Sequence, residues 1–219
     1  MSPNAPTAAD ADRDQSRAEE FANAASHALA GLLPLLAWPT LAAAAQRQGG
    51  EWSVFAVAVF CVTMELQFIA SVVCHALPPG RAKLWARSVD HAAIYVFIAG
   101  SSTPFTLGAM PGTAGVATCA LVWALALTGA GLKLMRRLTN RRLSTGLYVL
   151  LGWCALLAAW PGVRMLDSTA LLWLLAGGFS YLVGTAFFVF DSSLRFGHFV
   201  WHLFVMAGSG CHLCAALGN

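Results

Sequence analysis

Seven long apolar segments dominate the sequence and constrain what it can fold into. Short polar or turn-forming stretches separate them, and they cover residues 27–45, 53–77, 90–109, 115–132, 143–160, 168–190 and 197–217. Each segment is close to the ~20 apolar residues that a helix needs to cross the hydrocarbon core of a bilayer. Long continuous runs favour helices over a membrane β-barrel, whose strands would be short and alternating. The pattern therefore predicts an all-α integral membrane bundle of seven transmembrane helices.

The composition excludes a water-soluble fold. Hydrophobic residues make up 58% of the 219 residues and charged residues only 11%, whereas an ordinary soluble domain is about 25% charged. Residues 1–18 are polar and are expected to form a flexible cytoplasmic tail, and residues 19–219 to form one membrane domain. The N-terminal stretch lacks the basic region and short apolar core of a signal peptide.

The distribution of basic residues predicts the orientation. A cytoplasmic N-terminus places eleven of the thirteen Lys and Arg residues inside and leaves only Arg47 and Arg164 outside. The positive-inside rule therefore selects this orientation, and seven crossings put the C-terminus outside. The alanine-rich, short-looped chain is expected to be a multi-pass cell-membrane protein of a bacterial inner membrane.

Ionisable and histidine residues inside the segments point to a site. Asp90 begins the third segment, and intramembrane charges are by default candidates for function. His198 and His202 are four residues apart, which places both imidazoles on one helix face. Ser71 and His75 repeat this spacing in the second segment. The expected topology puts all five residues at a similar depth on the cytoplasmic side.

The chemistry of these five side chains leaves two alternatives. Three imidazoles are a familiar ligand set for Zn²⁺, with a fourth position left for water. A nearby carboxylate can hydrogen-bond that water or act as its base. Buried polar residues that bridge helices by hydrogen bonds would show the same spacing, so spacing alone does not decide between metal and packing.

Several motifs resemble those of the hemolysin III proteins, which belong with the progestin and adipoQ receptors, including the adiponectin receptors. They run in the family's order from about residue 19 to the end. These motifs are E-x-x-N-x-x-[ST]-H at 20–27, S-x-x-x-H at 71–75, D-H-A-A-I-Y at 90–95, G-x-x-T-P-F at 100–105, and F-G-H-x-x-W-H at 196–202, with His212 at the expected interval. Jointly they are specific, although none is so alone.

The resemblance implies a seven-helix bundle with a zinc ion near the cytoplasmic face. By motif position, His75, His198 and His202 would be the zinc ligands. Asp90 would hold the zinc-bound water, and Ser71 would lie close by. Cys74 departs from the family pattern, because bacterial relatives commonly carry an aromatic residue before the histidine.

The other motif residues are expected to have structural roles. Glu20, Asn23 and His27 are predicted to form a capping and inter-helix network at the cytoplasmic rim, in preference to ligating metal. His91 is rotated by about 100° from Asp90 on a helix, so it is expected to pack or to support the site from outside.

The remaining polar residues are expected to belong to the bundle. Glu65 falls on a different helix face from His75 and is predicted to be protonated or hydrogen-bonded, with proton handling as the alternative. His212, beside Cys211 and Cys214, is expected to contribute to core packing. The six cysteines are interpreted as reduced small side chains.

Site chemistry and the resemblance together favour a zinc-dependent, ceramidase-like hydrolase of a lipid amide. Asp90 would accept the proton and Ser71 would orient the substrate, and the expected partners are membrane lipids, with a lipid amide or a fatty acid as ligand. One alternative is a non-catalytic receptor or regulator of membrane lipid homeostasis with structural zinc; another is cytolysis. Nucleic-acid binding is not expected, because topology and anionic lipids explain the basic loops. The oligomeric state is left open.

Overall fold

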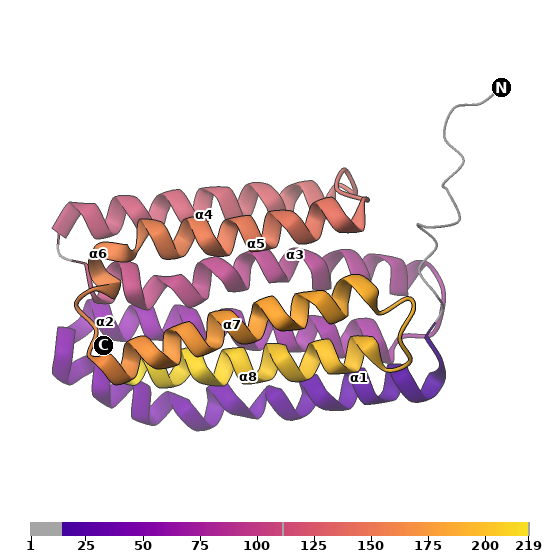
Figure 1. Cartoon of the computed structure of the whole chain (residues 1–219), viewed down its shortest axis with the longest axis horizontal. Helices are drawn as coiled ribbons and strands as arrows, with labels where there is room; N and C mark the ends of the chain where they lie inside the picture. The colour runs from indigo at the N-terminus through magenta and orange to yellow at the C-terminus, as the bar shows by residue number, and fades with distance from the viewer. Residues whose placement is uncertain (1–14, 111, 219) are drawn as a thin grey trace.

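The computed structural model describes residues 15–110 and 112–218, and every regular element within them is a helix (Figure 1). In chain order the elements are α1 (Arg17–Ala30), α2 (Leu32–Ala76), α3 (Arg81–Thr103), the π-helix η1 (Pro104–Gly108), α4 (Gly112–Leu134), α5 (Arg141–Ala158), α6 (Trp160–Val163), α7 (Ser168–Phe190) and α8 (Gly197–Leu217). The predicted tail falls outside the described residues except for positions 15–18, the last two of which belong to α1.

The first two helices form a long hairpin. α1 begins at a capping box, in which Ser16 Oγ accepts from the Glu19 amide and Glu19 Oε2 accepts from the Ser16 amide. Gly31 keeps helical backbone angles, so α1 runs almost directly into α2. At Gly50 the backbone takes φ 67° and ψ −148°, a conformation that glycine adopts without steric cost. α2 therefore has two arms, residues 32–49 and 51–76, which lie side by side (Figure 1).

Within the described residues, seven long helical segments follow the seven apolar runs of the sequence. α1 with the first arm of α2, and the second arm, supply two; α3 with η1, α4, α5, α7 and α8 supply the others. Four helical stretches are long and apolar enough to cross a membrane, namely 17–76, α4, α7 and α8. Large apolar side chains cover the exterior, such as Leu36 (76% exposed) and Phe179 (69% exposed). The chain is therefore an all-α, multi-pass membrane bundle.

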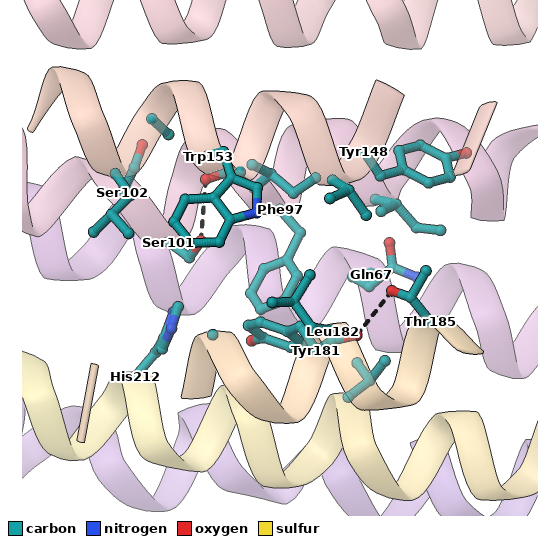
Figure 2. Close-up of a pocket in the computed structure, with 18 of the residues that line it drawn as sticks. Gln67, Phe97, Ser101, Ser102, Tyr148, Trp153, Tyr181, Leu182, Thr185 and His212 are labelled. Atoms are coloured by element: carbon teal, nitrogen blue, oxygen red, sulfur yellow. Dashed lines mark hydrogen bonds between the residues drawn. The ribbon is translucent and has the colours of Figure 1, made fainter. Parts of the chain in front are cut away.

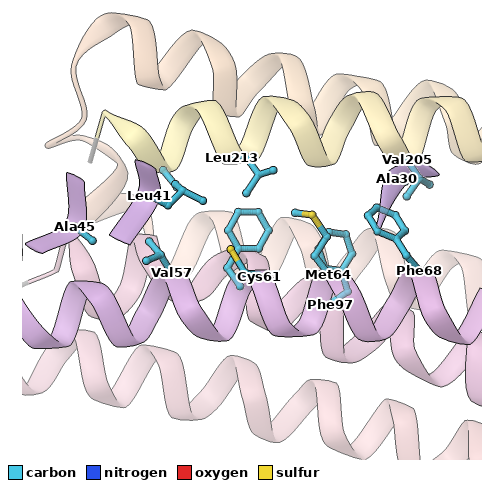
Figure 3. Close-up of a cluster of buried hydrophobic side chains, with 12 residues drawn as sticks. Ala30, Leu41, Ala45, Val57, Cys61, Met64, Phe68, Phe97, Val205 and Leu213 are labelled. Atoms are coloured by element: carbon cyan, nitrogen blue, oxygen red, sulfur yellow. The ribbon is translucent and has the colours of Figure 1, made fainter. Parts of the chain in front are cut away.

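A cluster of buried apolar side chains holds α8 against the α1–α2 hairpin. Phe60, Met64 and Phe68 of the second arm of α2 pack in this cluster with Val205 and Leu213 of α8 (Figure 3). A second cluster joins α3, α4 and α5. Since packing fixes the rotation of a helix about its axis, the first cluster also fixes which face of α8 is turned toward α2.

Seven helix ends meet at one end of the bundle. The start of α1, the end of α2 and the start of α3 meet there, together with the end of α4, the starts of α5 and α8, and the end of α7 (Figure 1). We call this the N-terminal end of the bundle. All polar residues that the sequence assigns to the site lie within a few turns of it.

Small residues permit close helix approach, and Gly129 provides a test. A Cβ at Gly129 of α4 would lie 2.5 Å from the Cε1 atom of Tyr95, whereas a Cβ at Gly131 would meet nothing within 4 Å. Gly129→Ala is expected to lower the free energy of unfolding by about 1–3 kcal/mol through overpacking. Gly131→Ala should leave it unchanged or raise it by up to about 1 kcal/mol, because alanine favours helix. Unfolding in detergent measures both, and equal effects would contradict the packing.

A buried histidine cluster as candidate metal site

Three imidazoles from two distant stretches of the chain converge at the N-terminal end of the bundle. His75 lies in the last turn of α2, and His198 and His202 lie in the first two turns of α8. One ligand nitrogen of each lies within 4.8 Å of the others. Their ring centroids are 4.8–5.2 Å apart. The structure thus brings together the three residues that the sequence proposes as ligands, in a cluster that could bind a metal ion.

The ring of His202 is fixed by α1. Its Nδ1 lies 3.2 Å from the backbone oxygen of Asn23 and 3.0 Å from Ser26 Oγ. Ser26 Oγ in turn donates to that same backbone oxygen. Because a carbonyl oxygen can only accept, Nδ1 of His202 carries the proton in the first contact. The lone pair for a metal ion is therefore on Nε2.

Carboxylates hold the other two rings in the same way. His75 Nδ1 lies 2.7 Å from Glu20 Oε2, and His198 Nδ1 lies 2.8 Å from Asp191 Oδ2. An ionised carboxylate accepts hydrogen bonds only, so these contacts also place the proton on Nδ1 and leave Nε2 free. Such outer partners are typical of metal-binding histidines, because they fix the tautomer and orient the ring.

Each carboxylate is balanced by a cation from another helix. Glu20 Oε1 lies 2.7 Å from Lys83 Nζ of α3. Asp191 pairs with Arg141 of α5, whose guanidinium also lies 4.4 Å above the Phe188 ring. These pairs neutralise charges in a mostly apolar surrounding, where an unpaired charge would be costly.

The Nε2 atom of His75 supports the metal interpretation independently. It is buried and has no hydrogen-bond partner among the described residues. A buried imidazole nitrogen without a partner is costly, and a metal ion would supply the missing interaction. Ligand atoms around a tetrahedral ion with bonds of ~2.1 Å lie about 3.4 Å apart, so modest ring rotations within the cluster suffice.

Asp90 and Ser71 stand beside the cluster at the wall of a cavity. Both are buried, at 7% and 0% exposure. Asp90 Oδ1 accepts a hydrogen bond of 3.2 Å from Gln67 Nε2. The histidine cluster thus has a carboxylate and a hydroxyl nearby that are not among its ligand atoms.

The cavity has a volume of about 400 Å³, and mostly apolar side chains of α3, α5, α7 and α8 line it (Figure 2). His202 and His212 both line it and are ten residues apart on α8, which corresponds to ~15 Å along a helix. The cavity therefore extends from the histidine cluster past the middle of the bundle toward its opposite end.

Glu20 and Asn23 connect α1 to other helices, as predicted, whereas the cap of α1 is formed by Ser16 and Glu19 and not by the predicted residues. Glu20 joins α1 to α2 and α3, and the Asn23 backbone joins α1 to α8. His27 is not in the ligand cluster; its ring stacks on that of His202 with centroids 3.6 Å apart and an interplanar angle of 5°.

The other candidates lie outside the ligand cluster. His91 lines the cavity and turns its ring edge to Phe188. His212 packs edge-on against Tyr181. Glu65 lies across from Gly31, and its Oε2 has no hydrogen-bond partner within residues 15–110 and 112–218. The six cysteines are free.

Sequence reasoning missed Asp191, Arg141 and Gln67. Gln67 carried a usable signal, because Gln67, Ser71 and His75 are spaced at i, i+4 and i+8 and so share one face of α2. Asp191 and Arg141 carried none, since their contacts depend on how the α7–α8 link folds back and where α5 packs.

The Asp191 contact predicts a measurable effect on metal affinity. Asp191→Asn replaces the carboxylate by a neutral amide that orients His198 less firmly and no longer balances Arg141. We expect the affinity for Co²⁺, followed by its absorption spectrum, to fall about 10–100-fold. Asp167→Asn is the control, because Asp167 caps α7 through the Ala170 amide and contacts no histidine. Equal affinities for wild type and Asp191→Asn would contradict the assignment.

Comparisons with known proteins identify the family of the chain. The family model for haemolysin-III related proteins matches residues 15–213. The chain is 36% identical over 191 residues to the Hemolysin-3 homolog of Bacillus subtilis (strain 168), covering 87% of this chain and 89% of the relative. It is 35% identical to Hemolysin-3 of Bacillus cereus, with 87% of each chain covered.

More distant relatives are found in mammals. Identity to the human Monocyte to macrophage differentiation factor is 27% over 155 residues, which covers 68% of this chain and 63% of the relative. No solved structure matches the chain significantly. The family model spans most of the bundle, including all three clustered histidines, and the two bacterial relatives each cover 87% of the chain. The chain belongs to the haemolysin-III related family, within the superfamily of progestin and adipoQ receptors.

Proposed function

We propose that this chain binds Zn²⁺ through Nε2 of His75, His198 and His202 and hydrolyses the amide bond of a membrane lipid. One observation carries the proposal. Three imidazoles, each with its Nδ1 proton held by an outer partner, stand beside a buried carboxylate at the head of an apolar cavity. Neutral imidazoles in this number suit zinc and leave a coordination position open.

The proposed topology has seven crossings with the N-terminus in the cytoplasm, in a bacterial inner membrane. The basic residues support it, because ten of the twelve Lys and Arg in the described residues gather at the N-terminal end of the bundle. That group comprises Arg17, Arg81, Lys83, Arg87, Lys133, Arg136, Arg137, Arg141, Arg142 and Arg195. Arg47 and Arg164 lie toward the opposite end. The positive-inside rule then places the histidine cluster on the cytoplasmic side.

Zinc at this site would polarise a substrate carbonyl and lower the pKa of water to about 7. The chain's own residues supply the remaining functions. Asp90, held by Gln67, accepts a proton from the attacking water and returns it to the leaving amine. Ser71 orients the polar part of the substrate. The apolar walls exclude bulk water, which strengthens the electrostatic interactions within the site.

The shape of the cavity favours a lipid as substrate. Its length along α8 and its apolar lining suit an acyl chain, whose polar head would then lie at the histidine cluster. Membrane lipids are available to such a cavity without transfer through water. An amide carbonyl placed between the cluster and Asp90 would be positioned for hydrolysis.

A second candidate function is structural. The histidine cluster joins α2 to α8, and its outer partners reach α1, α3 and α5. Zinc there could stabilise one arrangement of the helices in a non-catalytic regulator of membrane lipid homeostasis. The two functions differ in whether Asp90 is needed for anything beyond folding.

The two functions are separated by assaying turnover and zinc together. Wild-type protein in detergent is expected to contain zinc and to release fatty acid from a fluorescent N-acyl sphingosine. Asp90→Asn should retain zinc and lose turnover by at least about 100-fold, the scale typical of a general base. His202→Ala should lose both. Zinc retention with no turnover in wild type, and lower stability after chelation, would favour the structural function.

The cavity provides a test that leaves the metal site untouched. Gly178 of α7 lines the cavity, and a Cβ there would meet nothing within 4 Å. Gly178→Leu should fit without clash and fill part of the cavity, so turnover should fall about tenfold or more with zinc content unchanged. Gly146→Leu is the control, since Gly146 is equally open but does not line the cavity. Equal turnover in both variants would exclude this cavity as the substrate site.

A further inference from the structure

Three residues at the head of the cavity have buried polar atoms with no hydrogen-bond partner among the described residues. They are Oε1 of Gln67, Oγ of Ser71 and both ring nitrogens of His27. The residues are 4%, 0% and 2% exposed, and all three line the cavity. Such atoms are rare in folded proteins, because each one forgoes its hydrogen bonds to water.

The orientation of the Gln67 amide is fixed by Asp90. Its Nε2 donates to Asp90 Oδ1 at 3.2 Å, and a carboxylate accepts but does not donate. The amide is therefore turned so that the free atom is the oxygen. Oε1 of Gln67 is an acceptor only, and its partner has to bring an N–H or O–H group.

The other two residues border the same space. Ser71 lies one turn along α2 from Gln67, on the same helix face. His27 reaches the cavity from α1 and stacks on the cluster ligand His202. Hydroxyl and imidazole groups can each accept a hydrogen bond. The three side chains therefore offer several acceptors next to the histidine cluster.

A metal ion in the histidine cluster does not satisfy these atoms. Among the His, Cys, Asp and Glu side chains of the described residues, the cluster comprises His75, His198 and His202 only, so His27 lies outside it. Zinc in proteins is bound by Cys, His and carboxylate side chains, so the amide oxygen of Gln67 and the hydroxyl of Ser71 are not expected to join it. The acceptors therefore call for a second polar partner, which lies at the head of the cavity.

We propose that Gln67, Ser71 and His27 form a subsite that accepts hydrogen bonds from an N–H or O–H group in the head of a lipid. This inference rests on the proposed function, and it assigns the residues that select the substrate. Gln67 is the central member, because its free atom can only accept a hydrogen bond. A ligand group that is itself only an acceptor is therefore excluded at this position. Lipids whose linkage carries a donor, such as secondary amides, fit the subsite.

The subsite discriminates between two ligands of nearly equal shape. N-ethylpalmitamide has an N–H in its linkage, whereas ethyl palmitate has an ester oxygen at that position. The ester would leave Gln67 Oε1 buried and facing another acceptor. Sites built to hydrogen-bond a donor discriminate strongly against analogues that lack it.

Competition binding tests the proposal with the full chain as purified, in detergent. Each ligand displaces a fluorescent fatty-acid probe, and recovered ligand is checked for hydrolysis. Wild type should bind the amide at least about 10-fold more tightly than the ester. In Gln67→Met, which keeps the side-chain length but has no amide oxygen, this ratio should fall below about threefold. Ser71→Ala should lower it as well.

Thr63→Val is the matched control. Thr63 lies one turn before Gln67 on the same face of α2, is buried, and donates to the Phe60 backbone oxygen at 3.0 Å without lining the cavity. Its amide-to-ester ratio should match that of wild type. If Gln67→Met fails to fold, as judged by thermal unfolding, Ser71→Ala decides.

Equal affinity of wild type for the two ligands would overturn the subsite, and so would an unchanged ratio in both Gln67→Met and Ser71→Ala. These outcomes leave the hydrolase proposal standing, since turnover is measured separately. A clear amide preference in a protein that never releases fatty acid would support the subsite and contradict the hydrolase.

Discussion

Hydrocarbon offers no hydrogen bonds, so each polar group inside a membrane bundle needs a partner within the protein. This constraint organises the N-terminal end of the bundle. The Nδ1 atoms of His75, His198 and His202 are each satisfied by an oxygen from α1 or from the link before α8. Satisfying Nδ1 leaves Nε2 of each ring available to a metal ion. The arrangement that could bind a metal ion is thus a consequence of how the histidines are held.

The same constraint makes α1 a wall of the site. Its apolar residue Phe21 is exposed on the outside, while Glu19, Asn23, Ser26 and His27 are buried. Glu19 accepts from the Phe196 amide at the start of α8, Glu20 holds His75, and His27 stacks on His202. A helix that is polar along one side is stable here because that side meets histidines and helix ends, and not hydrocarbon.

Charge balance connects the site to the cavity walls. Arg141 begins α5, which lines the cavity, and it pairs with Asp191, which holds His198. The position of α5 and the orientation of a cluster histidine are therefore physically linked. The histidine cluster and the apolar cavity are therefore built by the same helices. The helices that orient the histidines also line the space proposed for a lipid.

The sequence by itself determined the number and order of the seven long helical segments and the three clustered histidines. Apolar length and the i, i+4 spacing are local properties, and helix geometry converts them directly into segments and faces. The tertiary structure alone decided which oxygen holds each imidazole, that the Gln67 amide donates to Asp90, and that Arg141 meets Asp191. These contacts join residues far apart in the chain, so they depend on how the helices pack against each other, which no local pattern encodes.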